Sequence, residues 1–200
     1  MPGLTWQPSL LDNAEPQFHP TLGAARRRLL GSGAWVDLVP GWATGTGALF
    51  DQLLEEVEWA GRRRRMYERM VDEPRLHAAR WGDKPDVLRR MSSALSHHYG
   101  RRLPSITANL YRDGNDSVAW HGDRVGRRSA DTVVAILSLG STRRFLLRPD
   151  GGGPSIRYDL HPGDLIVLGG TCQTTWEHCI PKRAQAGPRI SVMFREPGVR

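Results

Sequence analysis

The fold is decided by residues 105–196, which open with SITANLYRDGNDSVAWHGD (residues 105–123) and close with RISVMFRE (residues 189–196). Eight short runs of strand-forming residues lie in this stretch, and Gly, Pro, Asp and Asn turn signals separate them. The runs between the two quoted segments are VVAILSLG, RRFLLRP, SIRYDL, DLIVLGG and TWEHCIP. Eight successive short strands predict a β-sandwich or a distorted barrel.

The chain before residue 104 has a different pattern. Residues 48–59 (ALFDQLLEEVEW) and residues 86–100 (DVLRRMSSALSHHYG) carry apolar side chains at helical spacing and predict two amphipathic helices, the second stopped by Gly100. Residues 1–25 hold four prolines and predict an irregular arm. We therefore expect a mainly β protein of the α+β class. Its single domain would span residues 26–200, with a helical, nucleotide-recognising part (26–103) bracing a strand-rich core (104–196).

Composition adds expectations about location and partners. The chain has no apolar run of about 18 residues and no basic start followed by an apolar stretch, so neither a membrane span nor a secretory signal is predicted. Cys172 and Cys179 then favour reduced thiols and a cytoplasmic location. The net charge of +7, nearly all from an excess of arginine, favours a polyanionic partner such as nucleic acid. The alternative is a compositional habit of the source organism.

A metal site is predicted around the single His-x-Asp motif, His121-Gly122-Asp123. Side chains two residues apart on a strand point to the same side, so this segment offers an imidazole and a carboxylate to one ion. His178, on the seventh strand-like run, supplies a third ligand. Two His and one carboxylate on one face of an iron leave three positions for a chelating cosubstrate and dioxygen. The alternative reading is solvated polar residues at strand ends.

The last run, RISVMFRE, makes the metal reading stronger. Ile190, Val192 and Phe194 form an apolar face, while Arg189 and Arg195, six residues apart, share the other face. Arginines beside a ferrous site could bind a dicarboxylate through bidentate pairs. Asn109 and Tyr111, two residues apart, can also face inward as donors. The alternatives are an edge strand with a solvated face and ordinary polar strand positions.

Taken together, these segments resemble the AlkB family of 2-oxoglutarate- and Fe(II)-dependent dioxygenases. The resemblance covers about residues 74–196. The motif order that carries it is Asn-x-Tyr, His-x-Asp, His and Arg-x5-Arg, in NLYRDGNDSVAWHGD, SLGSTRRFLLRP, GDLIVLGGTCQTTWEHCIPK and PRISVMFRE. The family implies a double-stranded β-helix (jelly-roll) core that uses Fe(II), 2-oxoglutarate and O2.

The resemblance also implies roles for single residues. His121, Asp123 and His178 match the iron ligands. Arg189 matches the arginine that pairs with the distal carboxylate of 2-oxoglutarate, with help from Tyr111. The arginine near the metal-bound end of the cosubstrate, close to Asn109, corresponds to Arg195.

The implied reaction is oxidative demethylation of N-alkylated bases, such as 1-methyladenine and 3-methylcytosine, in DNA or RNA. It converts 2-oxoglutarate to succinate and CO2 and releases formaldehyde. The base must leave its stack to reach the iron. We expect single-stranded substrates, because no β-hairpin finger for opening a duplex is evident, and a monomeric enzyme.

Substrate contacts are predicted in several places. Residues 61–76 (GRRRRMYERMVDEPRL) fall where the family has its nucleotide-recognition lid. Tyr67 could stack on a base there, and Arg64, Arg69 and Arg75 could reach phosphates. The alternative for this arginine run is a solvated helix end. Arg148 and Trp176 are further candidates, and Trp120 is expected to pack in the core.

Two departures from the family pattern leave the substrate open. Arg124 and Val125 follow the His-x-Asp motif where many repair members have acidic residues, and an arginine does not help to bind a cationic methylated base. The lid also lacks an aromatic-rich segment. An oxygenase acting on a small molecule or a modified nucleoside is therefore the alternative function. A non-enzymatic nucleic-acid-binding module would not need the complete set of ligands and arginines.

Overall fold

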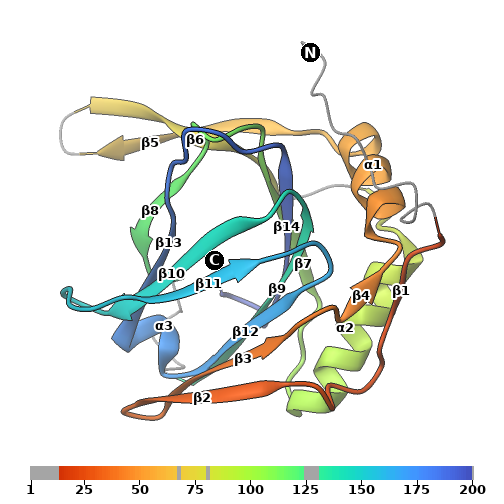
Figure 1. The fold of residues 1–200 in the computed structure, drawn as a ribbon, viewed down its shortest axis with the longest axis horizontal. Helices are drawn as coiled ribbons and strands as arrows, with labels where there is room; N and C mark the ends of the chain where they lie inside the picture. The colour runs from red at the N-terminus through yellow and green to blue at the C-terminus, as the bar shows by residue number, and fades with distance from the viewer. Residues whose placement is uncertain (1–13, 67–68, 80–81, 124–130, 200) are drawn as a thin grey trace.

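The computed structural model describes residues 14–66, 69–79, 82–123 and 131–199, with only the backbone described at 62, 64–66 and 69–72. The larger sheet is antiparallel, in the order β2-β3-β12-β9-β14-β7-β6-β5, and a smaller sheet has the order β11-β10-β13-β8 (Figure 1). The elements, in chain order, are β1 (Gln17–Phe18), β2 (Arg26–Gly31), β3 (Ala34–Val39), β4 (Ala43–Thr44), α1 (Thr46–Glu56), β5 (Ala60–Met66), β6 (Arg69–Ala78), α2 (Asp86–Tyr99), β7 (Ser105–Tyr111), β8 (Val118–His121), β9 (Thr132–Gly140), β10 (Arg143–Pro149), β11 (Ile156–Leu160), β12 (Leu165–Gly170), α3 (Cys172–Thr175), β13 (Trp176–Ile180) and β14 (Arg189–Arg195).

The larger sheet separates two hydrophobic cores. Because side chains alternate along a strand, β12 sends Leu165 and Val167 into a core shared with α1 and α2, and Ile166 and Leu168 into a core shared with the smaller sheet. Both longer helices accordingly lie on one side of the larger sheet (Figure 1). The opposite side faces the smaller sheet, and the space between the two sheets is where a site can form.

All eight strands expected after residue 104 are present as β7 to β14. The pairing explains the alternation in β14: it lies between β9 and β7, so both of its edges are hydrogen-bonded. Ile190, Val192 and Phe194 pack in the helix-side core, as their spacing predicts. The remaining side chains of β14 point into the space between the sheets.

The two predicted helices are confirmed with small shifts. α1 begins two residues earlier than expected and ends at Glu56, because Val57 is already extended. α2 ends at Gly100, whose φ of 61° is a left-handed conformation that favours glycine. Its buried face consists of Val87, Leu88, Met91, Ser92 and Leu95. In the part of the chain that the structure describes, no helix is long and apolar enough to cross a membrane.

Residues 26–103, predicted as the helical and nucleotide-recognising part, contain strands besides the two helices. This part also contributes β2 to β6, and the run Arg62–Arg65 lies on β5 and not at a helix end. β5 and β6 form a hairpin that extends well past the body of the protein (Figure 1). The arginine run shows no alternation of apolar and polar side chains. It is a strand because β5 pairs with β6, and β6 in turn pairs with the edge of β7 through Leu76, His77 and Ala78. The sequence pattern did not reveal this hairpin, and the expectation that no hairpin finger opens a duplex stays a prediction.

Candidate functional site

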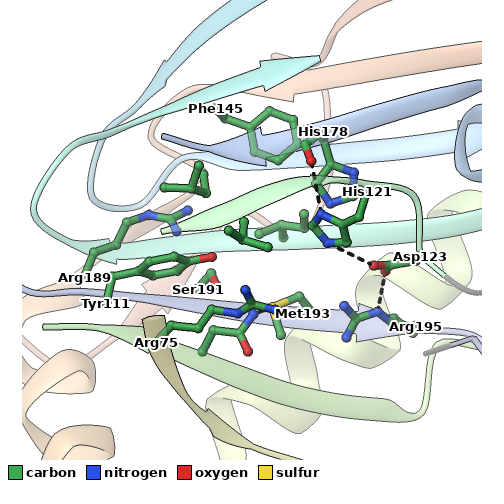
Figure 2. Close-up of a pocket in the computed structure, with 14 residues that line it drawn as sticks. Arg75, Tyr111, His121, Asp123, Phe145, His178, Arg189, Ser191, Met193 and Arg195 are labelled. Atoms are coloured by element: carbon green, nitrogen blue, oxygen red, sulfur yellow. Dashed lines mark hydrogen bonds and ion pairs between the residues drawn. The ribbon is translucent and has the colours of Figure 1, made fainter. Parts of the chain in front are cut away.

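A pocket lies between the two sheets and holds about 380 Å³ of empty space (Figure 2). It is lined from β6, β7, β8, β9, β10, β13 and β14, and by Asp123 just after β8. Its lining combines polar and charged side chains with the apolar side chains of Val118, Ile136, Phe145 and Ile180. Such a mixture is typical of a ligand site.

His121, Asp123 and His178 meet in this pocket. Each offers one ligand atom, and the three atoms lie within 4.8 Å of one another. The strands β8 and β13 bring the histidines together, because His121 pairs directly with His178 across the smaller sheet. A Cβ on Gly122 would lie 2.5 Å from the carbonyl oxygen of Gln173, so only glycine fits between the two ligands of the motif. The Asp123 backbone N–H donates to Gln173 Oε1 at 2.8 Å and holds the turn.

Both imidazoles are prepared to bind a metal in the neutral form. His121 Nδ1 lies 2.9 Å from the carbonyl oxygen of Ala119 and 3.1 Å from that of His178. Carbonyls only accept, so Nδ1 carries the proton and Nε2 presents its lone pair. Burial lowers the pKa of His121 below its usual value and lowers the pKa of His178 to about 3. The ring of His178 stacks on Phe145 with centroids 5.2 Å apart, which fixes its orientation.

Asp123 is held as a carboxylate by Arg195. Burial raises the pKa of Asp123, but the positive charge of Arg195 and the hydrogen bond that it donates outweigh burial, so the pKa is lowered overall. Arg195 Nε donates to Asp123 Oδ2 at 2.8 Å, and Arg195 Nη1 donates to Thr107 Oγ1 at 2.7 Å. The other oxygen, Oδ1, lies 4.0 Å from His121 Nε2 and remains available to a metal.

Arg189 lies deeper in the same pocket, fully buried and without a carboxylate partner among the described residues. Its Nε donates to Ser138 Oγ at 3.0 Å, its guanidinium lies 5.4 Å from the centre of the Tyr111 ring, and its Nη2 makes no hydrogen bond. Burial lowers its pKa to about 10. A buried cation with an unused donor calls for an anion.

Comparison with known proteins identifies the class of this site. The model of the 2OG-Fe(II) oxygenase superfamily matches residues 37–195. The chain belongs to the 2OG-Fe(II) oxygenase superfamily. Two solved structures show the same fold at low identity. A 2OG-Fe(II) oxygenase family oxidoreductase from Burkholderia pseudomallei has a TM-score of 0.55 and 14% identity, and the match covers 80% of this chain and 84% of that one. OsALKBH1 has a TM-score of 0.57 and 16% identity, and the match covers 84% of this chain and 100% of that one. The predicted jelly-roll fold is thereby confirmed.

Curated relatives confirm the resemblance to AlkB proteins within this superfamily. The human alpha-ketoglutarate-dependent dioxygenase alkB homolog 3 is 30% identical over 167 residues, which cover 77% of this chain and 56% of that protein. The DNA oxidative demethylase ALKBH2 of Arabidopsis thaliana is 31% identical over 139 residues, which cover 58% of this chain and 44% of that protein. The chain thus spans about half the length of the curated relatives it matches.

The residues present fit the cofactors of a 2OG-Fe(II) oxygenase. Two neutral imidazoles and one carboxylate form the donor set that leaves positions open on ferrous iron. The partnerless Nη2 of Arg189 fits a carboxylate of 2-oxoglutarate. Asn109 and Tyr111 also line the pocket, as their spacing predicts, and Asn109 Nδ2 makes only a weak contact with Met193 Sδ at 3.6 Å.

The predicted substrate residues have different surroundings. Arg75 lines the pocket itself, although it was expected to reach phosphates. Arg148 points to the outer face of the smaller sheet, where it lies 4.0 Å from the Trp120 ring centre and pairs with Glu177 at 2.6 Å. Trp120 is therefore partly buried under Arg148, and its expected place in the core was wrong. Trp176 packs against the core between the sheets and is not among the described residues that line the pocket.

The side chains of three predicted substrate residues fall outside the described part of the structure. Tyr67 lies outside the described residues, and of Arg69 and Arg64 only the backbone is described. Their proposed contacts with a base and with phosphates stay predictions.

One functional neighbour was missed. Arg143 is fully buried, and its guanidinium carbon lies 5.5 Å from the centre of the Tyr111 ring. The guanidinium donates hydrogen bonds to the carbonyl oxygens of Asp113, Asp116 and Pro181. Its contacts tie the turn between β7 and β8 to the end of β13. The alternation in RRFLLRP places Arg143 on the same face as Phe145 and Leu147, and this signal could have found it.

Proposed function

We propose that this chain is an Fe(II)- and 2-oxoglutarate-dependent oxidative demethylase of N-alkylated bases, such as 1-methyladenine and 3-methylcytosine, in DNA or RNA. One observation carries the proposal: a His-Asp-His donor set and a buried arginine with an unused donor face the same pocket. The names of the relatives, a dioxygenase and a DNA oxidative demethylase, support the choice of substrate. We further propose that the enzyme acts as a cytoplasmic monomer.

In this proposal His121, Asp123 and His178 hold the iron. Arg189, with Tyr111, pairs with the distal carboxylate of 2-oxoglutarate, and Arg195 and Asn109 lie near its metal-bound end. Bound iron and 2-oxoglutarate supply the oxidising chemistry, in which O2 is consumed, succinate and CO2 form, and the alkyl carbon leaves as formaldehyde.

The chain's own residues prepare this chemistry in three ways. Burial keeps both imidazoles unprotonated, so no proton competes with the metal. Arg195 keeps Asp123 ionised and fixes one of its two oxygens, which orients the other. The apolar wall of Val118, Ile136 and Phe145 limits water in the pocket and strengthens the arginine–carboxylate pairs.

Nucleic acid is the proposed partner because its phosphates match the net charge of +7. The arginine run of β5 belongs to the hairpin whose second strand, β6, carries Arg75 into the pocket. A base bound at the iron would therefore lie beside a hairpin rich in arginine. Since a hairpin can assist strand separation, the predicted preference for single-stranded substrates is best tested against duplexes of the same sequence.

The deciding experiment is mass spectrometry of oligonucleotides that carry one 1-methyladenine or 3-methylcytosine, with Fe(II), 2-oxoglutarate and ascorbate. We expect conversion of the methylated base to the unmodified base, and no conversion by His121→Ala. The matched control is His97→Ala, which removes an exposed histidine on α2. Unchanged oligonucleotides, together with succinate formation stimulated only by small metabolites, would replace the proposal with the small-molecule function.

A further inference from the structure

The pocket carries an excess of positive charge. Among the described residues that line it, three arginines (Arg75, Arg189 and Arg195) face one carboxylate, Asp123, which leaves two net positive charges. Histidines that bind a metal are neutral. The two charges of Fe(II) and the two of 2-oxoglutarate cancel, so loading the site does not remove the excess.

Among the described residues, little negative charge lies near the pocket to neutralise this positive excess. Asp123 is already paired with Arg195 at 2.8 Å. Glu73 lies 3.3 Å from Arg75, which reduces the excess to one charge, but Glu73 also contacts His77 at 2.6 Å and does not line the pocket.

Of the three arginines, Arg75 is the one to which no role in binding the cosubstrate is assigned. Arg189 and Arg195 both come from β14, whereas Arg75 comes from β6, whose Pro74 carbonyl accepts a hydrogen bond from Ser117 just before β8. The Arg75 side chain is only 12% exposed and its Nε has no hydrogen-bond partner.

An arginine has five N–H donors and no acceptor. Within each pair of related bases one exocyclic position differs: it is an oxygen in 1-methylguanine (O6) and 3-methylthymine (O4), and an amino group in 1-methyladenine (N6) and 3-methylcytosine (N4). An arginine can donate to the oxygen at this position but has no acceptor for the amino group. The first two bases are uncharged at neutral pH and the last two are cations. Charge and hydrogen bonding thus act in the same direction.

We infer that the pocket selects uncharged N-methylated bases, which carry an oxygen where the cationic ones carry an amino group, and that Arg75 determines this selectivity. The inference rests on the proposed demethylase function and specifies its substrate class. The chemistry is the same for both classes: O2 and 2-oxoglutarate are consumed, succinate and CO2 form, and N–CH3 becomes N–H with loss of formaldehyde. A single unscreened charge in a partly buried site changes binding by on the order of ten- to hundredfold.

The test uses two matched pairs of single-stranded oligonucleotides of one sequence. The first pair compares 1-methylguanine with 1-methyladenine, and the second compares 3-methylthymine with 3-methylcytosine. Demethylation rates are measured by mass spectrometry, and dissociation constants are measured by fluorescence anisotropy with Fe(II) and 2-oxoglutarate under nitrogen, where no turnover occurs. We expect about tenfold or greater preference for the uncharged member of each pair in both measurements.

Equal or reversed preference in either pair would overturn the inference while leaving the demethylase function in place. Failure to demethylate all four bases would instead refute the proposed function. The two failures are therefore distinguishable. Because wild-type ratios decide the question, the test does not depend on how a variant folds.

Variants at Arg75 assign the selectivity to this residue. Arg75→Gln removes the charge, and we expect the preference within each pair to fall toward one, mainly through tighter binding of the cationic base. Arg75→Lys keeps the charge and should retain most of the preference. Arg26→Gln removes an exposed arginine on β2 and serves as the control for lost nucleic-acid affinity. If Arg75→Gln weakens all four oligonucleotides equally, Arg75 does not determine selectivity.

Discussion

Replacing Arg189 by Met should leave the ligand-free protein as stable as the wild type or more stable, although the substitution removes a fully buried side chain. The reason is that Arg189 is a cation without a carboxylate partner among the described residues. Burial lowers its pKa from 12.5 to about 10. Below about pH 10 the guanidinium is charged in both the folded and the unfolded state, so folding bears the full cost of burying the charge. This cost disappears only as the pH rises from about 10 toward 12.5.

The size of this destabilisation follows from the lowered pKa of Arg189. At about 1.4 kcal/mol per pKa unit, keeping Arg189 charged costs roughly 3 kcal/mol of folding free energy at neutral pH. The hydrogen bond to Ser138 Oγ returns about 1 kcal/mol. The interaction with Tyr111 raises the pKa and is already contained in the net shift. Arg189→Met loses this gain and the whole cost. The expected net change without ligand is between zero and about 2 kcal/mol of added stability.

The opposite is expected once 2-oxoglutarate is present. At a hundredfold excess over its Kd, a ligand stabilises the wild type by about 2.7 kcal/mol. In a domain of this size that corresponds to a rise in Tm of roughly 5–10 °C. Arg189→Met leaves the distal carboxylate unpaired in a buried site, which costs about 3–5 kcal/mol, so the shift should vanish.

Arg143→Met is the matched control, because Arg143 lies on the same tyrosine ring but donates to three carbonyl oxygens. Losing these bonds should destabilise the protein by about 3–5 kcal/mol with or without 2-oxoglutarate. The assay is thermal unfolding of wild type and both variants under nitrogen with Fe(II), with and without 2-oxoglutarate. An Arg189→Met protein that is less stable without ligand, and that 2-oxoglutarate still stabilises, would refute the reasoning.

Three further predictions concern the metal ligands. His178 stays neutral in the folded protein (pKa about 3) but takes up a proton near pH 6.5 in the unfolded chain, so the stability of the metal-free protein should fall as the pH drops below 6.5. Between pH 7 and pH 5, the free energy of unfolding measured with urea should decrease by about 2 kcal/mol more in the wild type than in His178→Gln. His178→Ala should weaken Mn(II) binding, measured by calorimetry, by about 100-fold or more, and unchanged affinity would show that His178 is not a ligand. Gly122→Ala places a Cβ 2.5 Å from the Gln173 carbonyl oxygen and should cost about 1–3 kcal/mol and weaken metal binding, whereas Gly23→Ala, with no atom within 4 Å, should change neither.

The part of the fold that could be predicted is the part in which local pattern and tertiary environment agree. β9 and β12 are buried on both faces and read as continuous apolar runs, and α2 shows helical spacing up to Gly100. β2 and β5 could not be predicted in this way. Both are rich in arginine, and they are strands only because β3 and β6 offer backbone partners.

The same division applies to the site. Period-two alternation in residues 109–123 and 189–195 was enough to predict which side chains share a face, because the geometry of a strand is local. Asn109, Tyr111, Arg189 and Arg195 accordingly all line the pocket. The alternation could not show which faces meet.

What the sequence by itself determined is the donor set: two histidines and two arginines that lie on strands, and one carboxylate that lies just after a strand. What only the tertiary structure decided is their convergence and the charge balance around them. The pairing of β8 with β13 brings His178 opposite His121, and the pairing of β6 with β7 carries Arg75 into the same pocket. The physical reason is that strand pairing joins segments far apart in the chain, and the number of positive charges facing one carboxylate depends on which segments it joins.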